Sequence, residues 1–232
     1  MKIDAILFDL DGTLLDTLED LADSCNNALN DAGLPSLPLE EYKSHVGSGA
    51  RNLVSAAMAS AHTVMSGEPC RKSDLDKGYT DRIFKLYREI YSRSWSSKTV
   101  IYEGITDLLT ALREKNIKLA VLSNKPDDFT KIMVDYYFPA GTFDMVYGLS
   151  ESWPAKPDPG LALDICRQFG VKPENTVLVG DSGSDMETAL RAGMIPLGVL
   201  WGFRDAKELK KAGAESLFSK SAELAEFLLS SC

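Results

Sequence analysis

The sequence lacks a surplus of basic residues and lacks a long apolar segment, and each lack excludes a class of protein. The 232 residues carry a formal net charge of −9, whereas a nucleic-acid or membrane-surface binder would need a basic face. Its apolar runs stay short of the ~18 residues that a membrane helix needs. We therefore expect no nucleic-acid partner and no membrane. An anionic partner would then need a local cation or backbone N–H groups to overcome the negative field.

The sequence also has few cysteines and histidines. Its four cysteines show no CxxC spacing, which is typical of reduced thiols rather than of disulfides or zinc ligands; they are Cys25, Cys70, Cys166 and Cys232. The first residues contain acidic side chains and no signal-peptide core. These features predict a cytoplasmic location. They leave the choice between a monomer and a homodimer open.

The first stretch that suggests chemistry is Asp9-Leu10-Asp11-Gly12, which follows an apolar run from Ile3 to Phe8. Such a run predicts a strand that is buried on both faces. Ligands of an open α/β sheet bind where its strands end. Two carboxylates this close raise each other's pKa unless a cation lies between them or one stays protonated. An ordinary Asp-Gly turn explains the stretch about equally well when it is taken alone.

The rest of the chain has two regions that differ in their hydrophobic pattern. Residues 16–98 show only helical periodicity, whereas residues 99–232 alternate between short apolar strands and amphipathic helices. Alternation of this kind predicts an α/β fold, a Rossmann-like parallel sheet with helices on both faces. We therefore expect a core formed by residues 1–15 and 99–232, and an inserted all-helical cap domain at 16–98, the natural position for a lid.

Three further places combine polar side chains with a strand end or a rigid loop. Ser123 and Asn124 follow a strand expected at 117–122, which suits an anion cradle, although a helix cap would explain them alone. Asp181 and Asp185 bracket a Gly-Ser loop after the strand at 176–179, an oxygen-rich arrangement that suits Mg²⁺. Lys156 lies between stiff proline-containing segments, although a solvated lysine is the usual alternative.

These segments together resemble the four motifs of the haloacid dehalogenase superfamily, in order. The motifs are Asp9-Leu10-Asp11-Gly12-Thr13, Ser123-Asn124, Lys156-Pro157 and Gly180-Asp181-Ser182-Gly183-Ser184-Asp185. The resemblance covers the whole chain, including the helical insert, and within the superfamily it is greatest to the phosphoglycolate phosphatase group. The first and fourth motifs are specific as a pair, whereas the second and third are weak without them.

The resemblance implies a role for each motif residue. Asp9 would attack phosphorus to form an aspartyl-phosphate, and Asp11 would protonate the leaving alkoxide and then activate water. Ser123 and the backbone N–H of Asn124 would hold phosphoryl oxygens, and Lys156 would neutralise the charge on nucleophile and phosphate. Charge stabilisation of this kind is what phosphoryl transfer requires.

The resemblance also implies a cofactor and a substrate class. Mg²⁺ would be held by Asp9, the Asp11 carbonyl and Asp181, with Asp185 assisting. The implied activity is Mg²⁺-dependent hydrolysis of a small anionic phosphate monoester, with 2-phosphoglycolate as the first choice. A phosphosugar mutase, a pyrophosphatase, a nucleotidase or a non-catalytic phosphate-binding protein are the alternatives. The carboxylate at Asp11 argues against haloacid dehalogenases, which lack one there.

Substrate choice is expected to lie in the helical insert, because the core would recognise only phosphate. The segment from His45 to Arg51 contains two glycines that open a loop before a new helix. The resemblance places a substrate-contacting loop here, which includes Gly47. We expect Arg51 to bind a second anionic group of the substrate through two hydrogen bonds. An exposed arginine at a helix start is an equally good interpretation.

Overall fold

The structure is a computed structural model that describes residues 2–231, and the chain divides into two compact units. One unit comprises Met1–Asp16 and Ile101–Cys232, and the other comprises Thr17–Val100. Short strands lie at the two points where the chain passes between the units, β2 (Leu15–Asp16) and β3 (Val100–Ile101). The expected limits of the helical insert were residues 16 and 98.

The first unit is built on a parallel sheet, as predicted. Within the described residues the sheet has six strands in the order β5-β4-β1-β6-β7-β8. Their bounds are β1 (Ala5–Phe8), β4 (Lys118–Pro126), β5 (Met145–Leu149), β6 (Thr176–Gly180), β7 (Ile195–Val199) and β8 (Ser216–Phe218). All residues of β1 and β6 are buried, which explains why these strands are apolar without alternation.

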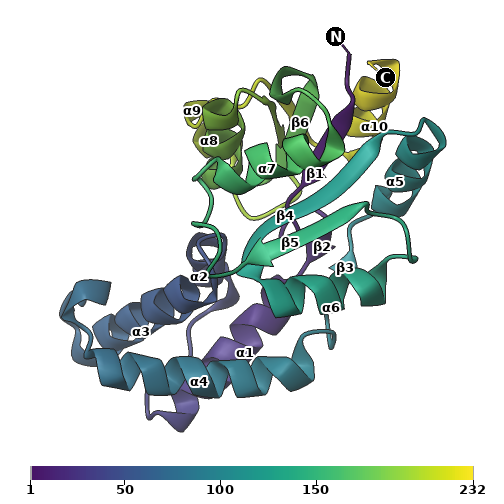
Figure 1. The fold of residues 1–232 in the computed structure, drawn as a ribbon. Coiled ribbons are helices and arrows are strands. Elements are labelled where there is room, and N and C mark those ends of the chain that lie inside the picture. The colour runs from purple at the N-terminus through teal and green to yellow at the C-terminus, as the bar shows by residue number, and fades with distance from the viewer. Residues whose placement is uncertain (1, 232) are drawn as a thin grey trace. The chain divides into compact units, whose positions relative to one another are not determined.

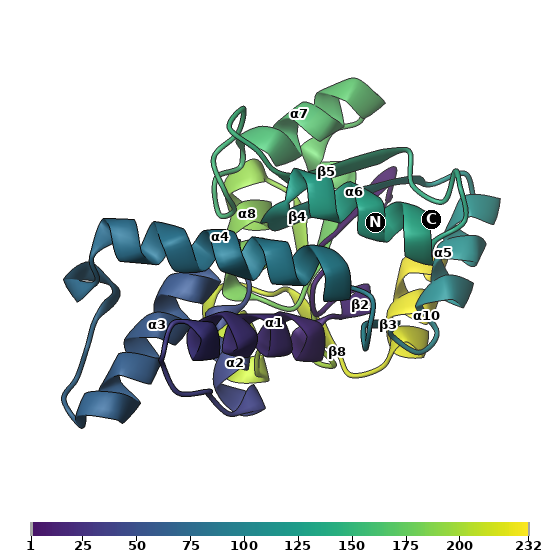
Figure 2. The ribbon, with the colours of Figure 1, turned by 90° about the horizontal axis from the view of Figure 1, so that it is seen from below.

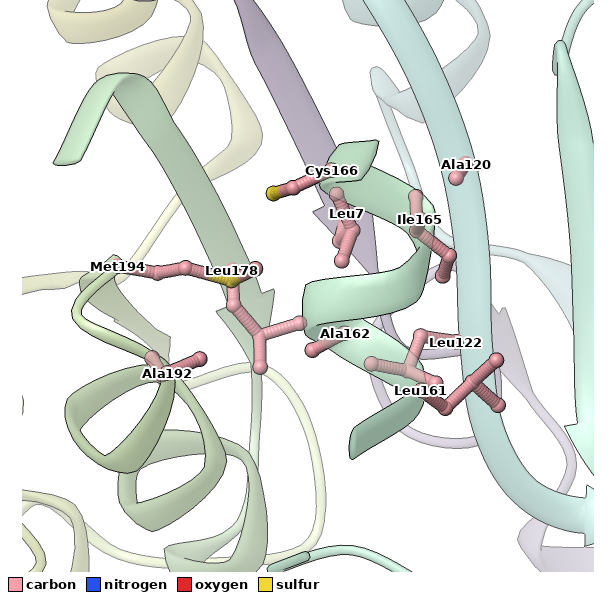
Figure 3. Close-up of a cluster of buried hydrophobic side chains, with 11 residues drawn as sticks. Leu7, Ala120, Leu122, Leu161, Ala162, Ile165, Cys166, Leu178, Ala192 and Met194 are labelled. Carbon is pink, nitrogen blue, oxygen red and sulfur yellow. The ribbon is translucent and has the colours of Figure 1, made fainter. Parts of the chain in front are cut away.

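Helices cover both faces of this sheet (Figure 1). Their bounds are α5 (Ile105–Glu114), α6 (Asp127–Tyr137), α7 (Gly160–Phe169), α8 (Gly183–Ala192), α9 (Ala206–Lys211) and α10 (Ser221–Ser230), with a 3₁₀ turn η2 (Pro173–Asn175). One face is packed by α7 and α8, whose apolar side chains meet those of the strands (Figure 3). This buried cluster contains Leu7, Leu122, Ile165, Leu178 and Ala189.

The connections reverse direction at β1. From β1 the chain continues to β4 and then to β5 on one side, and α7 afterwards carries it back to β6 on the other side of β1. Right-handed crossovers therefore place α5 and α6 on one face and α7 and α8 on the opposite face. The crevice at the carboxyl ends of β1 and β6 is the switch point where such sheets bind ligands. Asp9 follows β1 and Asp181 follows β6 at that point.

One strand differs from its predicted extent. The apolar run predicted that the strand ends at Leu122, but β4 continues to Pro126 and includes the polar residues Ser123, Asn124 and Lys125. Its pairing with β5 is regular up to Leu122 and is resumed at Pro126 after a register shift. Ser123 and Asn124 therefore lie on the strand and not in a loop after it. Polar strand ends of this kind cannot be recognised from hydrophobicity.

The second unit is entirely helical between Leu18 and Ser94, apart from its loops. Its elements are α1 (Leu18–Asp31), α2 (Leu39–His45), α3 (Ala50–Ser66), η1 (Lys72–Asp74) and α4 (Lys77–Ser94). Helices α1 and α4 lie side by side (Figure 2). The buried aromatic residues Tyr42, Tyr87 and Tyr91 contribute to its own core.

The buried carboxylate of Asp20 ties the beginning of α1 to the end of the same unit. It accepts hydrogen bonds from the Lys98 N–H at 3.0 Å and from the Thr99 N–H and hydroxyl at 2.8 and 2.7 Å. A carboxylate that takes several donors in this way fixes two segments 78 or 79 residues apart in sequence. The first and last residues of the helical unit are thus held together inside it.

Candidate active site

Three aspartates from two strand ends gather at the switch point. Asp9, Asp181 and Asp185 are all buried, and each offers a carboxylate oxygen within 4.8 Å of the others. The Asp9 N–H extends the β1–β6 ladder by donating to the Val179 carbonyl at 2.9 Å, so the backbone of Asp9 is fixed by the sheet. The structure thus brings Asp9 of the first motif together with Asp181 and Asp185 of the fourth.

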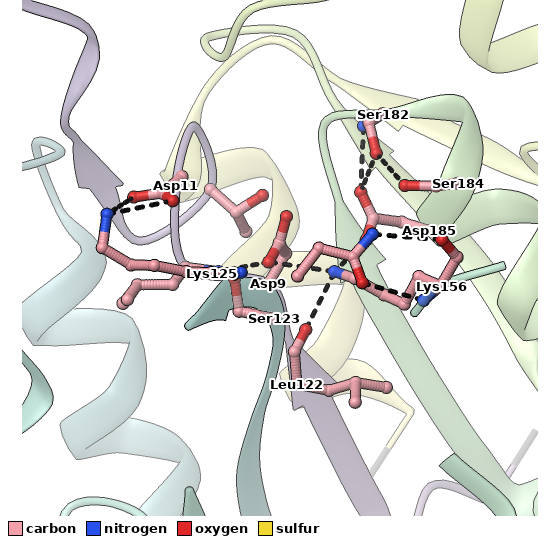
Figure 4. A network of polar contacts seen from close by, with 12 residues as sticks. Asp9, Asp11, Leu122, Ser123, Lys125, Lys156, Ser182, Ser184 and Asp185 are labelled. Carbon is pink, nitrogen blue, oxygen red and sulfur yellow. Dashed lines mark hydrogen bonds and ion pairs between the residues drawn. The ribbon is translucent and has the colours of Figure 1, made fainter. Parts of the chain in front are cut away.

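Lys156 lies between two of these carboxylates. Its ammonium nitrogen Nζ is 2.9 Å from Asp9 Oδ1 and 2.6 Å from Asp185 Oδ1, and it donates to the Leu122 carbonyl at 2.9 Å (Figure 4). The three N–H bonds of an ammonium group match these three acceptors. Burial alone would lower the pKa of Lys156, but the carboxylates of Asp185 and Asp9 outweigh it and raise the pKa. The lysine is therefore a fixed positive charge.

The side chain of Asn124 fixes the backbone of Lys156. Its Oδ1 accepts from the Lys156 N–H at 2.8 Å, and its Nδ2 donates to the Lys156 carbonyl at 3.1 Å. This reciprocal pair joins β4 to the loop after β5. The sequence predicted a phosphate contact through the Asn124 backbone N–H and did not foresee a role for the side chain amide.

Asp185 combines a helix cap with its contact to Lys156. It is the third residue of α8, and its Oδ2 accepts from the Ser182 N–H at 3.0 Å and from the Ser182 hydroxyl at 2.5 Å. This capping box uses one carboxylate oxygen and leaves Oδ1 for the lysine. The position of Asp185 in the first helical turn follows from the sequence, whereas its contact with Lys156 does not.

Asp181 is held by segments from both ends of the unit. The Thr13 hydroxyl donates to its Oδ1 at 3.2 Å, and the Phe203 N–H donates to its Oδ2 at 2.8 Å. Two glycines make room for it, since a Cβ at Gly12, where φ is +83°, or at Gly202 would overlap the Asp181 side chain.

The segment that contains Phe203 makes a second contact in this site. The Trp201 indole N–H also donates to the Thr13 carbonyl, at 3.1 Å. Trp201–Phe203 therefore braces the loop after β1 as well as Asp181. Backbone contacts of this kind leave no signal in the side chains of a sequence.

Burial raises the pKa values of two of the clustered aspartates. Burial is the main reason that the pKa of Asp9 rises to about 6, although Lys156 pulls it down; the charges of Asp185 and Asp11 add to the rise. Burial also raises the pKa of Asp181 to about 8, and Asp185 and Asp9 contribute to it through repulsion. These carboxylates are costly to ionise together without a further cation.

The donor set fits a hard divalent cation. The three clustered carboxylates offer oxygen ligands only, which Mg²⁺ and Ca²⁺ prefer. A cation there would also relieve the repulsion that raises the pKa values of Asp9 and Asp181. The prediction that Asp9, Asp181 and Asp185 are metal ligands is consistent with this cluster.

Asp11 does not join the cluster through its side chain. Both of its carboxylate oxygens instead face the ammonium of Lys125, at 3.0 and 3.2 Å. The side chains of Lys125 and Asp11 are 3% and 11% exposed, so the pair is largely shielded from water. Lys125 could not be recognised from the sequence, because a lysine after Ser123-Asn124 resembles an ordinary loop residue if the strand ends at Leu122.

The two residues expected to choose the substrate lie in the helical unit. Gly47 has a φ of +104° in the turn between α2 and α3. Arg51, in the first turn of α3, pairs with Asp81, and its guanidinium carbon lies 4.5 Å from the centre of the Phe84 ring. Arg51 is thus oriented by a carboxylate and an aromatic face, and its side chain remains 55% exposed.

A parallel sheet with buried carboxylates and a lysine at its switch point can place metal ligands and a positive charge around a phosphoryl group. The profile of the haloacid dehalogenase-like hydrolases matches residues 6–199. The chain therefore belongs to this family, and the resemblance drawn from the four motifs is confirmed.

Individual relatives agree with the family assignment. The chain is 30% identical to a phosphoglycolate phosphatase of Psychrobacter arcticus over 97% of this chain and 95% of the relative. It is 32% identical to a phosphoglycolate phosphatase of Nitrosospira multiformis over 94% of this chain and 92% of the relative. These relatives confirm that the chain is an enzyme of the phosphoric monoester hydrolase class, a class whose haloacid dehalogenase-like members typically use a divalent metal.

Solved structures share the whole fold. A candidate phosphoglycolate phosphatase from Lactobacillus delbrueckii superposes with a TM-score of 0.90 at 32% identity, covering 98% of this chain and 99% of that one. A β-phosphoglucomutase from Clostridium difficile also superposes, with a TM-score of 0.74 at 19% identity over 99% of this chain and 96% of that one. The second likeness shows the fold alone.

Two further expectations concern the cysteines and the membrane. Cys25, Cys70 and Cys166 are free, and Cys232 lies outside the described residues. Among residues 2–231 we find no helix with the length and apolar character needed to cross a membrane.

Proposed function

We propose that this enzyme is a Mg²⁺-dependent phosphatase that hydrolyses a small phosphate monoester, with 2-phosphoglycolate as the substrate of first choice. The observation that carries the proposal is the buried cluster of Asp9, Asp181 and Asp185 at the switch point, with Lys156 paired to Asp9 and Asp185. The substrate is suggested by the relatives named phosphoglycolate phosphatase, which align over most of the chain.

Asp9 is the proposed nucleophile. Its Oδ1 accepts from the Leu10 N–H at 2.8 Å and faces Lys156, which orients the carboxylate. An Asp9 oxygen forms a bond to phosphorus while the bond from phosphorus to the ester oxygen breaks. The resulting aspartyl-phosphate splits one difficult displacement into two easier ones.

Asp11 is the proposed acid and base. It gives a proton to the departing ester oxygen in the first step. In the second step it takes a proton from the water that attacks phosphorus, so that Asp9 is restored and phosphate leaves. One residue can serve both steps because each returns it to the state that the other requires.

The remaining groups hold the phosphoryl oxygens and their charge. We assign the Ser123 hydroxyl and the Asn124 N–H to the phosphoryl oxygens and Lys156 to the negative charge that builds up on them. Asp9, Asp181, Asp185 and the Asp11 carbonyl would hold Mg²⁺, which when bound supplies further charge stabilisation to the phosphoryl group.

We assign substrate choice to the helical unit, as its cap domain, and the chemistry to the sheet unit. Arg51 is the proposed partner of a second anionic group, such as the carboxylate of 2-phosphoglycolate. A substrate carboxylate would then compete with Asp81 for the guanidinium. Gly47 shapes the turn before this helix.

A panel of phosphate compounds tests the proposal. Phosphate release is measured with and without Mg²⁺ for p-nitrophenyl phosphate, 2-phosphoglycolate, hexose phosphates, pyrophosphate and nucleoside monophosphates at equal concentration. We expect Mg²⁺-dependent turnover with the highest kcat/KM for 2-phosphoglycolate. Conversion of a hexose 1-phosphate to its 6-phosphate without phosphate release would indicate a mutase instead, and inertness toward every compound would overturn the proposal.

A further inference from the structure

The proposed mechanism gives no role to the buried ammonium of Lys125, which lies beside Asp11. Its side chain is 3% exposed and contacts both oxygens of Asp11 (Figure 4). The two residues are 114 positions apart, one at the end of β4 and the other after β1. Desolvation of two buried charges opposes their pairing, so such an ion pair adds little to the free energy of folding. We therefore expect a functional reason for the burial of Lys125 beside Asp11.

The backbone of Lys125 is fixed on several sides. Its N–H donates to the Ser123 hydroxyl at 3.3 Å, and its carbonyl accepts from the Thr130 hydroxyl at 3.2 Å. Gly148 of β5 approaches so closely that a Cβ there would meet the Lys125 carbonyl at 2.6 Å. The ammonium is therefore directed at Asp11 by a backbone that has little freedom to move.

Residues two positions apart on an extended chain point the same way, so Asp9 and Asp11 would both be able to reach one cation. The structure separates them. Each carboxylate has its own lysine, Lys156 for Asp9 and Lys125 for Asp11, and the group of mutually close metal-ligating oxygens contains Asp9 without Asp11.

We propose that Lys125 is a positioning residue for Asp11, which keeps that carboxylate out of the metal's coordination and available to the ester oxygen and the water. This inference rests on the proposed phosphatase function. An Asp11 carboxylate bound to the cation would be a ligand and could not exchange protons with the reactants. Lys125 acts on the reaction only through Asp11.

Lys125→Met tests the inference, because methionine has a similar length and no charge. The quantity to measure is kcat/KM, which in a two-step hydrolysis reports the steps up to departure of the alcohol. We compare an alkyl phosphate, whose alkoxide needs a proton to leave, with p-nitrophenyl phosphate, whose phenolate leaves without one. Loss of a positioned acid should lower kcat/KM for the alkyl ester about 10²-fold and leave the aryl ester much less affected.

A double-mutant cycle with Asp11→Asn shows whether Lys125 acts through Asp11. The kcat/KM for the alkyl ester should be no lower in the double variant Lys125→Met/Asp11→Asn than in Asp11→Asn alone.

A second measurement, thermal unfolding, needs no turnover. The rise in Tm that Mg²⁺ causes should be larger in Lys125→Met than in the wild type, because Asp11 can then join the cation, and this increment should shrink in the Asp11→Asn background.

Two further variants serve as controls. Lys125→Arg keeps the positive charge. Its ratio of kcat/KM for the alkyl ester to kcat/KM for the aryl ester should lie between those of Lys125→Met and the wild type. Lys172→Met removes a lysine whose side chain is 73% exposed, so kcat/KM for both esters and the Mg²⁺-induced rise in Tm should stay at the wild-type values. Equal losses on both esters in Lys125→Met, or additive losses in the cycle, would overturn the inference. An inert wild type would instead contradict the phosphatase proposal, so the two failures differ.

Discussion

At the scale of single residues, the lysine ammonium groups of the candidate active site are fixed by their acceptors. Lys156 uses all three N–H bonds on Asp9, Asp185 and the Leu122 carbonyl. A phosphoryl oxygen can contact this ammonium only by sharing or replacing one of those acceptors. In the proposed mechanism we therefore expect Lys156 to contribute less to binding of the substrate than to stabilising charge that develops during the reaction.

The nucleophile gives the simplest prediction. Asp9→Asn removes the attacking carboxylate and leaves a side chain of nearly the same shape. We expect kcat on p-nitrophenyl phosphate to fall roughly a thousandfold or more. An acyl-phosphate labile to hydroxylamine should form from labelled substrate in the wild type only. Normal turnover in Asp9→Asn, with a Tm near the wild-type value, would contradict the assignment.

The raised pKa values of Asp9, about 6, and Asp181, about 8, predict how pH changes metal binding. The folded metal-free chain retains protons there that the unfolded chain has lost, so its stability falls as pH rises from about 4 toward about 8. A divalent cation replaces these protons. The Tm rise caused by Mg²⁺ should therefore be larger at about pH 8.5 than at about pH 5.5.

Asp181→Asn is the control for this titration, measured by thermal unfolding across the same pH range. It removes one proposed metal ligand, which is also one of the two groups with a raised pKa, so both the Mg²⁺ effect and its dependence on pH should decrease. A Mg²⁺ effect that is independent of pH in the wild type would show that these carboxylates are not the ligands.

At the scale of elements, the Asp20 contact predicts where the helical unit is vulnerable. Asp20→Ala removes the acceptor of the buried Thr99 N–H and of the part-buried Lys98 N–H. The expected loss is about 2–3 kcal/mol in the free energy of unfolding, measured by urea denaturation of the full chain.

The neighbouring Asp23 provides a matched control for Asp20. It pairs with the Lys98 ammonium at 2.8 Å, but the two side chains are about half exposed, 54% and 49%. Asp23→Ala should therefore cost less than about 1 kcal/mol. Similar losses in the two variants would mean that burial of Asp20 is not what makes its contact important.

The elements also show what the sequence can and cannot predict. Apolar strands and strand-end aspartates are visible in the sequence, which is why the sheet and the positions of Asp9 and Asp181 after β1 and β6 were predictable. The polar end of β4 was not, because its pairing with β5 depends on backbone register and not on apolar side chains. The contact of Lys125 with Asp11 was missed for this reason.

Other contacts were hidden because they use the backbone. The Phe203 N–H that holds Asp181 and the Lys156 backbone that Asn124 binds could each come from almost any residue type. Sequence patterns report side chains, so contacts of this kind become visible only when distant segments are brought together.

At the scale of the whole molecule, the division into two units separates chemistry from substrate choice in our proposal. Arg51→Ala should lower kcat/KM about tenfold or more for a phosphate ester that carries a carboxylate, and far less for a neutral alkyl phosphate. The comparison is made by phosphate release on both esters. Arg71→Ala, at a side chain that is 85% exposed, is the matched control. Equal losses on the two esters would remove Arg51 from substrate recognition.

The two-part construction of the sheet unit also has a consequence for synthesis on the ribosome. Ala5 of the central strand β1 pairs with Lys118 and Thr176, so β1 is made first but must wait for partners more than a hundred residues later. The helical unit, whose residues are contiguous from Thr17 to Val100, is complete before either partner strand emerges. Nascent chains halted shortly before β4 should therefore hold a folded helical unit while the apolar strand β1 is still unpaired, a state that is exposed to aggregation.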